Sequence, residues 1–129
     1  RQLSFGFLDM AWHTLTSNFS SEIESFEDNA MSKTELFDKI QGSNMSVSFT
    51  HIFGGGYAAG YYGYKWAEVL DADAFKFFRE KGIFNPEVAE LYRRNILEKG
   101  GTDKPMNLYL KFRGKEPSID AFLERSGLK

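Results

Sequence analysis

The second half of the chain is divided by proline and glycine into helix-sized segments, and this spacing constrains the fold more than any other feature. All three prolines of the 129 residues lie here. Proline is common at the first position of a helix, and glycine is common just after its end. Asn85 before Pro86 is a typical helix start, because a short polar side chain caps free backbone N–H groups. The punctuation predicts helices over 85–100, 105–114 and 117–127.

Helical spacing of apolar residues extends over much of the remaining chain. It predicts a helix over 2–16 that is apolar on most faces and therefore buried, and a long proline-free helix over 58–81 that Gly82 ends. Between them, 17–46 is expected to be an exposed polar segment containing one short helix. That helix would begin at Ser32, where Glu35 completes a capping box. No strand alternation is present, so the sequence predicts an all-α fold of about six helices.

The composition excludes several classes of function. Sixteen Lys and Arg residues against 18 Asp and Glu residues give a formal charge of −2, which leaves no basic surface for nucleic acid or an anionic membrane. The absence of cysteine excludes disulfides, thiol nucleophiles and cysteine metal sites. The run 49–64 carries no formal charge, but it is short, rich in glycine and contains a histidine, so we expect no transmembrane helix.

Residues 51–64, HIFGGGYAAGYYGY, carry five glycines, four tyrosines and one of the two histidines. Tyr57 and Tyr64 are seven residues apart, which is nearly two helical turns, so a helix that starts near Tyr57 would bring both phenols to one face. His51 could reach the same place from the loop. Neutral phenols are hydrogen-bond donors at pH 7, so this group would suit a peptide carbonyl that becomes an oxyanion. The alternative is that the tyrosines only pack and the glycines only allow close helix contact.

Other candidate sites are less well supported by the residues. His13 and His51 are too far apart for the i, i+4 pair of a zinc-protease helix, and His13 is expected to be a hydrogen-bonded core residue. Gly55 to Gly60 has the spacing of a phosphate-binding loop but lacks the lysine that should follow. Asp71 and Asp73 lie two residues apart on a helix, so their side chains point in different directions, and we expect a solvated or capping role.

Three stretches resemble the thimet oligopeptidase family of zinc metallopeptidases, in its bacterial peptidyl-dipeptidase and oligopeptidase A branch. They are FTHIFGGGYAAGYYGYKWAEVLDADAF at 49–75, the segment 82–128 with its FRGKEPSIDAFL, and FLDMAWHTL at 7–15. The likeness covers essentially the whole chain and is weakest over 17–45. A histidine, a glycine run and two tyrosines seven residues apart, followed by Trp and Glu, form a specific combination.

The resemblance implies a largely helical, two-lobed enzyme that cleaves short peptides in a deep channel. In that family zinc sits on a helix carrying His-Glu-x-x-His, with a further Glu as ligand, and the metal-bound water attacks the peptide. The glycine-rich loop would be flexible and border the channel. By position, His51 and Tyr57 would contact substrate, and Tyr64 would donate to the developing oxyanion. The loop glycines implied to contact substrate are Gly54, Gly55, Gly56 and Gly60.

No His-Glu-x-x-His motif occurs in the sequence, so residues 1–129 are expected to be a single helical C-terminal part of a larger peptidase. We expect this part to bind no zinc and to be inactive alone, with short peptides and the upstream polypeptide as partners. Its apolar first helix predicts self-association. A non-catalytic helical module that binds peptides is the alternative function. The choice between dipeptide release and internal cleavage stays open, and the cytoplasm is the expected compartment, with the periplasm as the alternative.

Overall fold

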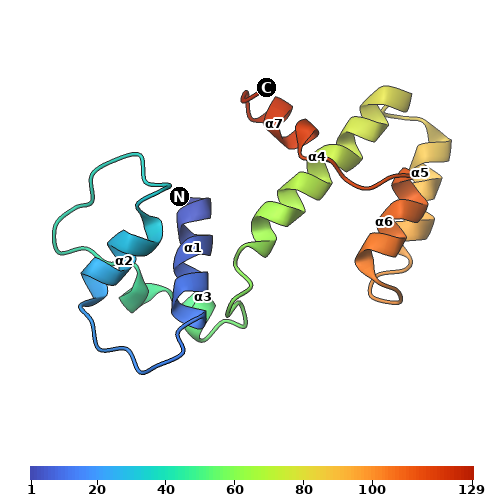
Figure 1. Ribbon diagram of the computed structural model, residues 1–129. Coiled ribbons are helices and arrows are strands. Elements are labelled where there is room, and N and C mark those ends of the chain that lie inside the picture. The colour runs from blue at the N-terminus through green and yellow to red at the C-terminus, as the bar shows by residue number, and fades with distance from the viewer. The chain divides into compact units, whose positions relative to one another are not determined.

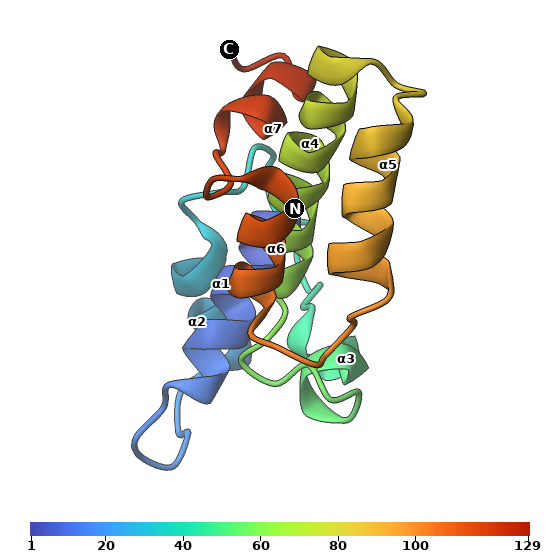
Figure 2. The same ribbon diagram turned by 90° about the vertical axis from the view of Figure 1, so that its right-hand side faces the viewer.

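All regular structure of the protein is helical in the computed structural model, which describes residues 1–129 (Figures 1 and 2). The prediction of an all-α fold is confirmed: there are seven α-helices, one short 3-10 helix, one π-helical segment and no strand. The chain divides into two compact units, Arg1–Lys65 and Trp66–Lys129. None of the helices combines the length and apolar character that a bilayer crossing requires.

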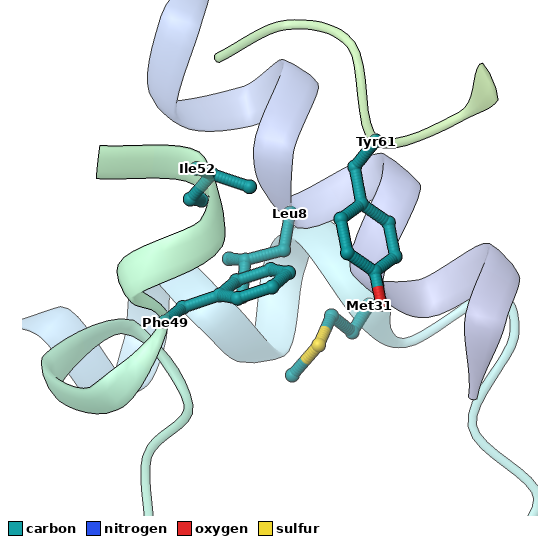
Figure 3. Close-up of a cluster of buried hydrophobic side chains, with 5 residues drawn as sticks. All are labelled: Leu8, Met31, Phe49, Ile52 and Tyr61. Carbon is teal, nitrogen blue, oxygen red and sulfur yellow. The ribbon is translucent and has the colours of Figure 1, made fainter. Parts of the chain in front are cut away.

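The first unit is built from short helices around an apolar cluster. Its elements are α1 (Gln2–His13), α2 (Ile23–Met31), η1 (Ser46–Ser48), α3 (Thr50–Phe53) and the first residues of α4 (Gly63–Lys81). Helices α1 and α2 pack against each other, and α3 lies near them (Figure 1). The buried side chains of the cluster are Leu8, Met31, Phe49, Ile52 and Tyr61 (Figure 3).

Two predictions for the first unit are wrong. Residues 23–31 were predicted to be part of an exposed polar segment, but they form helix α2. The short helix was predicted to begin at Ser32, but residues 32–45 form turns and irregular structure. Ser32 follows the end of α2 and donates its N–H to the carbonyl of Asp28 at 2.9 Å. The reason is tertiary: α2 buries Glu27 and Met31, and this burial outweighs the local capping signal.

Helix α1 lies where it was predicted, but it buries one face rather than most of its surface. Ser4, Gly6, Leu8 and Asp9 are buried. The apolar residues on its other side, Leu3, Phe7 and Met10, are exposed by 55%, 48% and 37%. The long helix α4 begins at Gly63, five residues later than the predicted position 58, because 58–62 form turns.

The second unit packs its helices around aromatic rings. It contains the rest of α4, α5 (Pro86–Tyr92), the π-helical η2 (Arg93–Leu97), α6 (Pro105–Arg113) and α7 (Asp120–Arg125). The buried cluster joins Val88, Tyr109 and Phe112, and partly buried residues of α4 and η2 pack around it. The ring of Phe112 lies 5.2 Å from that of Tyr92 and 5.6 Å from that of Phe77.

The capping signals of the second unit are largely confirmed. The Oδ1 atom of Asn85 accepts the N–H of Glu87 at 2.9 Å. Gly114 and Gly127 adopt positive φ angles of 78° and 70° just past the ends of α6 and α7. Pro117 precedes the last helix by three residues instead of opening it, and the Ser118 hydroxyl accepts the N–H of Asp120 at 3.1 Å.

The expectation of a solvated or capping role is confirmed for Asp71 of α4 and is wrong for Asp73. Asp71 is exposed and pairs with Arg125 at 2.5 Å. Asp73 is buried and accepts the Tyr109 hydroxyl at 2.6 Å and the Arg113 Nε–H at 3.1 Å. The two side chains point in different directions, as a spacing of two on a helix requires, and only one of them faces the core.

Candidate functional site

Residues 51–64 form a turn that closes on itself. Helix α3 ends at Phe53, and after it the N–H of Tyr57 donates back to the carbonyl of His51 at 3.2 Å. The N–H of Gly60 then donates to the carbonyl of Tyr57 at 2.9 Å. A Cβ atom at Gly55 would lie 2.9 Å from the His51 carbonyl oxygen, so any other residue here would force the turn to shift.

The side chains of His51, Tyr57 and Tyr64 come together at this turn. The rings of Tyr57 and Tyr64 are stacked with centroids 5.4 Å apart and planes 19° apart. The His51 ring lies 6.0 Å from that of Tyr57. The predicted reason for this proximity is wrong, because Tyr57 precedes α4 and is not on a shared helix. The turn over 57–63 brings the phenols together instead of helical periodicity.

The phenols of Tyr57 and Tyr64 are accessible, while that of Tyr61 is not. Tyr57 and Tyr64 are exposed by 40% and 39%, whereas Tyr61 is 9% exposed and belongs to the core (Figure 3). A hydrogen bond with Tyr57 raises the pKa of the Tyr64 hydroxyl above its ordinary value of 10. The Tyr64 phenol is therefore neutral at pH 7 and can donate its proton in a hydrogen bond.

A buried carboxylate supports the turn, and the sequence reasoning missed it. Asp9 of α1 is fully buried, and its two oxygens accept the N–H groups of Ala59 and Tyr61, each at 2.9 Å. The Nδ1 atom of His13 hydrogen-bonds the backbone carbonyl of Asp9 at 2.9 Å and lies 2.8 Å from the same carboxylate. His13 is hydrogen-bonded as expected but lies at the surface and not in the core. A single charge within the apolar run FLDMAW was the available signal.

A second buried carboxylate holds the segment that leads into α3. Glu27 is fully buried and accepts the N–H of Met45 at 2.9 Å as well as that of Ser46. Burial alone would raise the pKa of Glu27, but the hydrogen bonds from Ser46 and Met45 and the charge of Lys39 lower it below its ordinary value. Glu27 therefore stays ionised at neutral pH and fixes the backbone just before η1.

The residues of this chain do not fit a zinc site. No three or more His, Cys, Asp or Glu side chains gather where they could share one metal ion. The Nδ1 atom of His13 faces Asp9, and His51 has aromatic rings as its neighbours. A zinc site with protein ligands needs three or four such groups around one point, so no ligand is assigned to this chain.

A helical chain that presents a histidine and two phenols on a glycine turn has clear relatives among the peptidases. The chain belongs to peptidase family M3, whose sequence model matches residues 1–128. Together with the relatives described next, this match confirms the resemblance to the oligopeptidase A and peptidyl-dipeptidase branch.

The relatives include proteins of bacteria and of a plant. Oligopeptidase A of Haemophilus influenzae is 43% identical over 129 residues, covering 99% of this chain and 19% of that protein. The probable cytosolic oligopeptidase A of Arabidopsis thaliana is 40% identical, covering 99% of this chain and 19% of that protein. The dipeptidyl carboxypeptidase of Salmonella typhimurium is 38% identical, covering 98% of this chain and 19% of that protein. The chain thus spans about a fifth of the length of these relatives.

Proposed function

We propose that this chain is part of a zinc-dependent peptidase that hydrolyses short peptides, and that residues 51–64 form its substrate-binding turn. The observation that carries the proposal is the pair of accessible, stacked phenols of Tyr57 and Tyr64 beside His51. Membership of peptidase family M3 and the names of the relatives support the reaction class. The zinc ligands of such an enzyme would lie outside this chain, which would be inactive alone.

In this proposal each side chain has a separate task. Tyr64 donates its hydroxyl proton in a hydrogen bond to the peptide carbonyl oxygen as that oxygen gains negative charge. Tyr57 and His51 hold the neighbouring substrate backbone, and the glycine backbone lets the peptide approach closely. A donor that meets the charge only as it develops lowers the barrier rather than the Michaelis constant. Loss of one such donor reduces the rate by about 10²–10³.

Substrate length and compartment belong to the same proposal. The relatives are named as oligopeptidases and as a dipeptidyl carboxypeptidase, so short peptides are the common substrate class. The name of the cytosolic plant relative supports a cytoplasmic location. Cell fractionation with detection of the full-length protein tests the compartment, and cleavage positions in a peptide ladder test the choice between dipeptide release and internal cleavage.

The experiment replaces Tyr64 by Phe in the full-length polypeptide that contains this chain. Tyr64→Phe removes only the hydroxyl, and we expect kcat on a quenched-fluorescent peptide to fall by about 10²–10³ with KM little changed. Tyr62→Phe is the matched control, because Tyr62 is exposed by 52% and lies two residues away. An unchanged kcat in Tyr64→Phe would favour a packing role. Peptide binding without any turnover in the unaltered, zinc-loaded protein would favour the non-catalytic binding module.

A further inference from the structure

The side chain of Asp9 is fully buried in the first unit. An ionised carboxylate inside an apolar helix face costs free energy unless partners replace its water. Asp9 has three partners: the N–H groups of Ala59 and Tyr61, 50 and 52 residues away, and the Nδ1 atom of His13. Both long-range partners are backbone groups of the turn that carries the phenols.

The backbone between these two N–H groups is strained. Ala59 has a φ angle of +52° and is the only residue other than glycine with a positive φ angle. For a residue with a Cβ atom this conformation is sterically unfavourable. Such strain persists only where surrounding contacts hold it, and the charge-assisted hydrogen bond from the Ala59 N–H to Asp9 is such a contact.

Both phenols are tied to the segment that Asp9 holds. On one side, the Gly60 N–H donates to the carbonyl of Tyr57 at 2.9 Å. On the other side, the Tyr64 N–H donates to the carbonyl of Tyr61 at 3.3 Å. The position of the Asp9 carboxylate therefore sets the positions of the Tyr57 and Tyr64 backbones, each through one further hydrogen bond.

We propose that Asp9 is a positioning residue that holds the turn over 58–61, so that the hydroxyls of Tyr57 and Tyr64 meet at one point before a peptide binds. The Nδ1 atom of His13 hydrogen-bonds the backbone carbonyl of Asp9 at 2.9 Å, and it also lies 2.8 Å from the carboxylate. The inference rests on the proposed function, because it gives the peptidase a prearranged donor pair. A donor that needs no rearrangement during the reaction stabilises a developing charge most effectively.

The first test measures backbone hydrogen exchange by mass spectrometry in the full-length protein carrying Asp9→Asn. The amide keeps the shape of the side chain but replaces one acceptor oxygen with a donor, so it cannot accept both backbone N–H groups. We expect exchange over 57–64 to become at least tenfold faster. Glu27→Gln is the matched control, since it alters another buried carboxylate of the same unit, and its effect should centre on 44–48. Unchanged exchange over 57–64 in Asp9→Asn would overturn the proposal.

The second test asks whether Asp9 acts through Tyr64. We expect Asp9→Asn to lower kcat by about tenfold or more in the otherwise unaltered enzyme, and by less than about threefold in the Tyr64→Phe background. Equal losses in both backgrounds would overturn the positioning role. If Tyr64→Phe itself keeps full turnover, the proposed function fails, and the exchange result alone decides the role of Asp9. If Asp9→Asn does not fold, the double variant Asp9→Asn, Ala59→Gly replaces it, because glycine relieves the positive φ angle at position 59. Exchange over 57–64 that is no faster than in Ala59→Gly alone would overturn the proposal.

Discussion

The two units bury carboxylates in different ways. In the first unit, Asp9 and Glu27 accept hydrogen bonds mainly from backbone N–H groups of turns that lie far along the chain. In the second unit, Asp73 accepts hydrogen bonds from the side chains of Tyr109 and Arg113, which both project from α6. The first arrangement fixes turns, and the second fixes one helix against another.

This difference follows from the segment that each carboxylate faces. Residues within a helix satisfy their own backbone groups, so a buried carboxylate that faces a helix needs side-chain partners. Turns leave N–H groups without helical partners, and a buried carboxylate that faces a turn can accept from these. The accessible phenols of Tyr57 and Tyr64 lie in the first unit. There the Asp9 carboxylate accepts hydrogen bonds from the turn between them, whose backbone includes the unfavourable φ angle of Ala59.

The largest expected effect on stability comes from Asp73. Asp73→Ala leaves the buried Arg113 guanidinium with only the more distant carboxylate of Glu80, 3.7 Å away, and the loss of one member of a buried pair costs about 3–5 kcal/mol. Burial and the hydrogen bond to Asp73 raise the pKa of Tyr109, so the phenol stays neutral and also loses an acceptor. Urea denaturation of the full-length protein measures the change. An equal loss in Asp71→Ala, where the aspartate is exposed, would contradict the assignment.

Glu27 should give a smaller effect with a distinct pH dependence. Glu27→Gln weakens the acceptor of two backbone N–H groups and should lower the free energy of unfolding by about 1–3 kcal/mol at pH 7. The pKa of Glu27 is lowered in the folded state. Its stabilising contribution is therefore present above the unfolded-state pKa near ~4.3 and is lost as pH falls through the lower folded-state value.

The check is unfolding measured from pH 7 down into the acid range. The difference in stability between the unaltered protein and Glu27→Gln should shrink below about pH 4.3. If the difference in unfolding free energy between the two proteins were the same at all pH values, the charge of Glu27 would not be its cause. The difference would then come from side-chain packing.

The success of prediction from sequence also differs between the units. Caps and terminators act within one helical turn, so the Asn85 start and the ends at Gly114 and Gly127 could be predicted. The π-helical stretch η2 inside a predicted helix had no such local signal. In the first unit, helix α2 depends on burial against distant residues, and the sequence around Ser32 favoured a different helix.

The residues of the candidate site could be predicted from the sequence, but the geometry that brings them together could not. His51, Tyr57 and Tyr64 were expected together, and their rings do approach one another. The turn that brings them together depends on Asp9, about 50 residues earlier in the chain, and no spacing rule connects such positions. The roles of these side chains in substrate binding stay a prediction.

Gly55 allows a test of how closely the turn must fold. Gly55→Ala places a Cβ atom 2.9 Å from the carbonyl oxygen of His51, and such overpacking costs about 1–3 kcal/mol. Gly63→Ala is the matched control, because nothing lies within 4 Å of its added Cβ atom and alanine favours the helix that begins there. Thermal unfolding of both variants in the full-length protein gives the comparison. Equal midpoints would show that the turn adjusts and that the close approach at Gly55 is not required.

The smallest expected effect concerns self-association of the isolated 129-residue chain. The outer side of α1 exposes Leu3, Phe7 and Met10 side by side, whereas Phe84 of the second unit is a single phenylalanine exposed by 97%. A second copy that covers the α1 patch would bury the exposed half of Phe7, which contributes about 1 kcal/mol, or roughly fivefold in association. Light scattering over a concentration series should therefore show weaker association for Phe7→Gln and little change for Phe84→Gln. A mass of one chain at every concentration, or an equal effect of the two substitutions, would place the association elsewhere or exclude it.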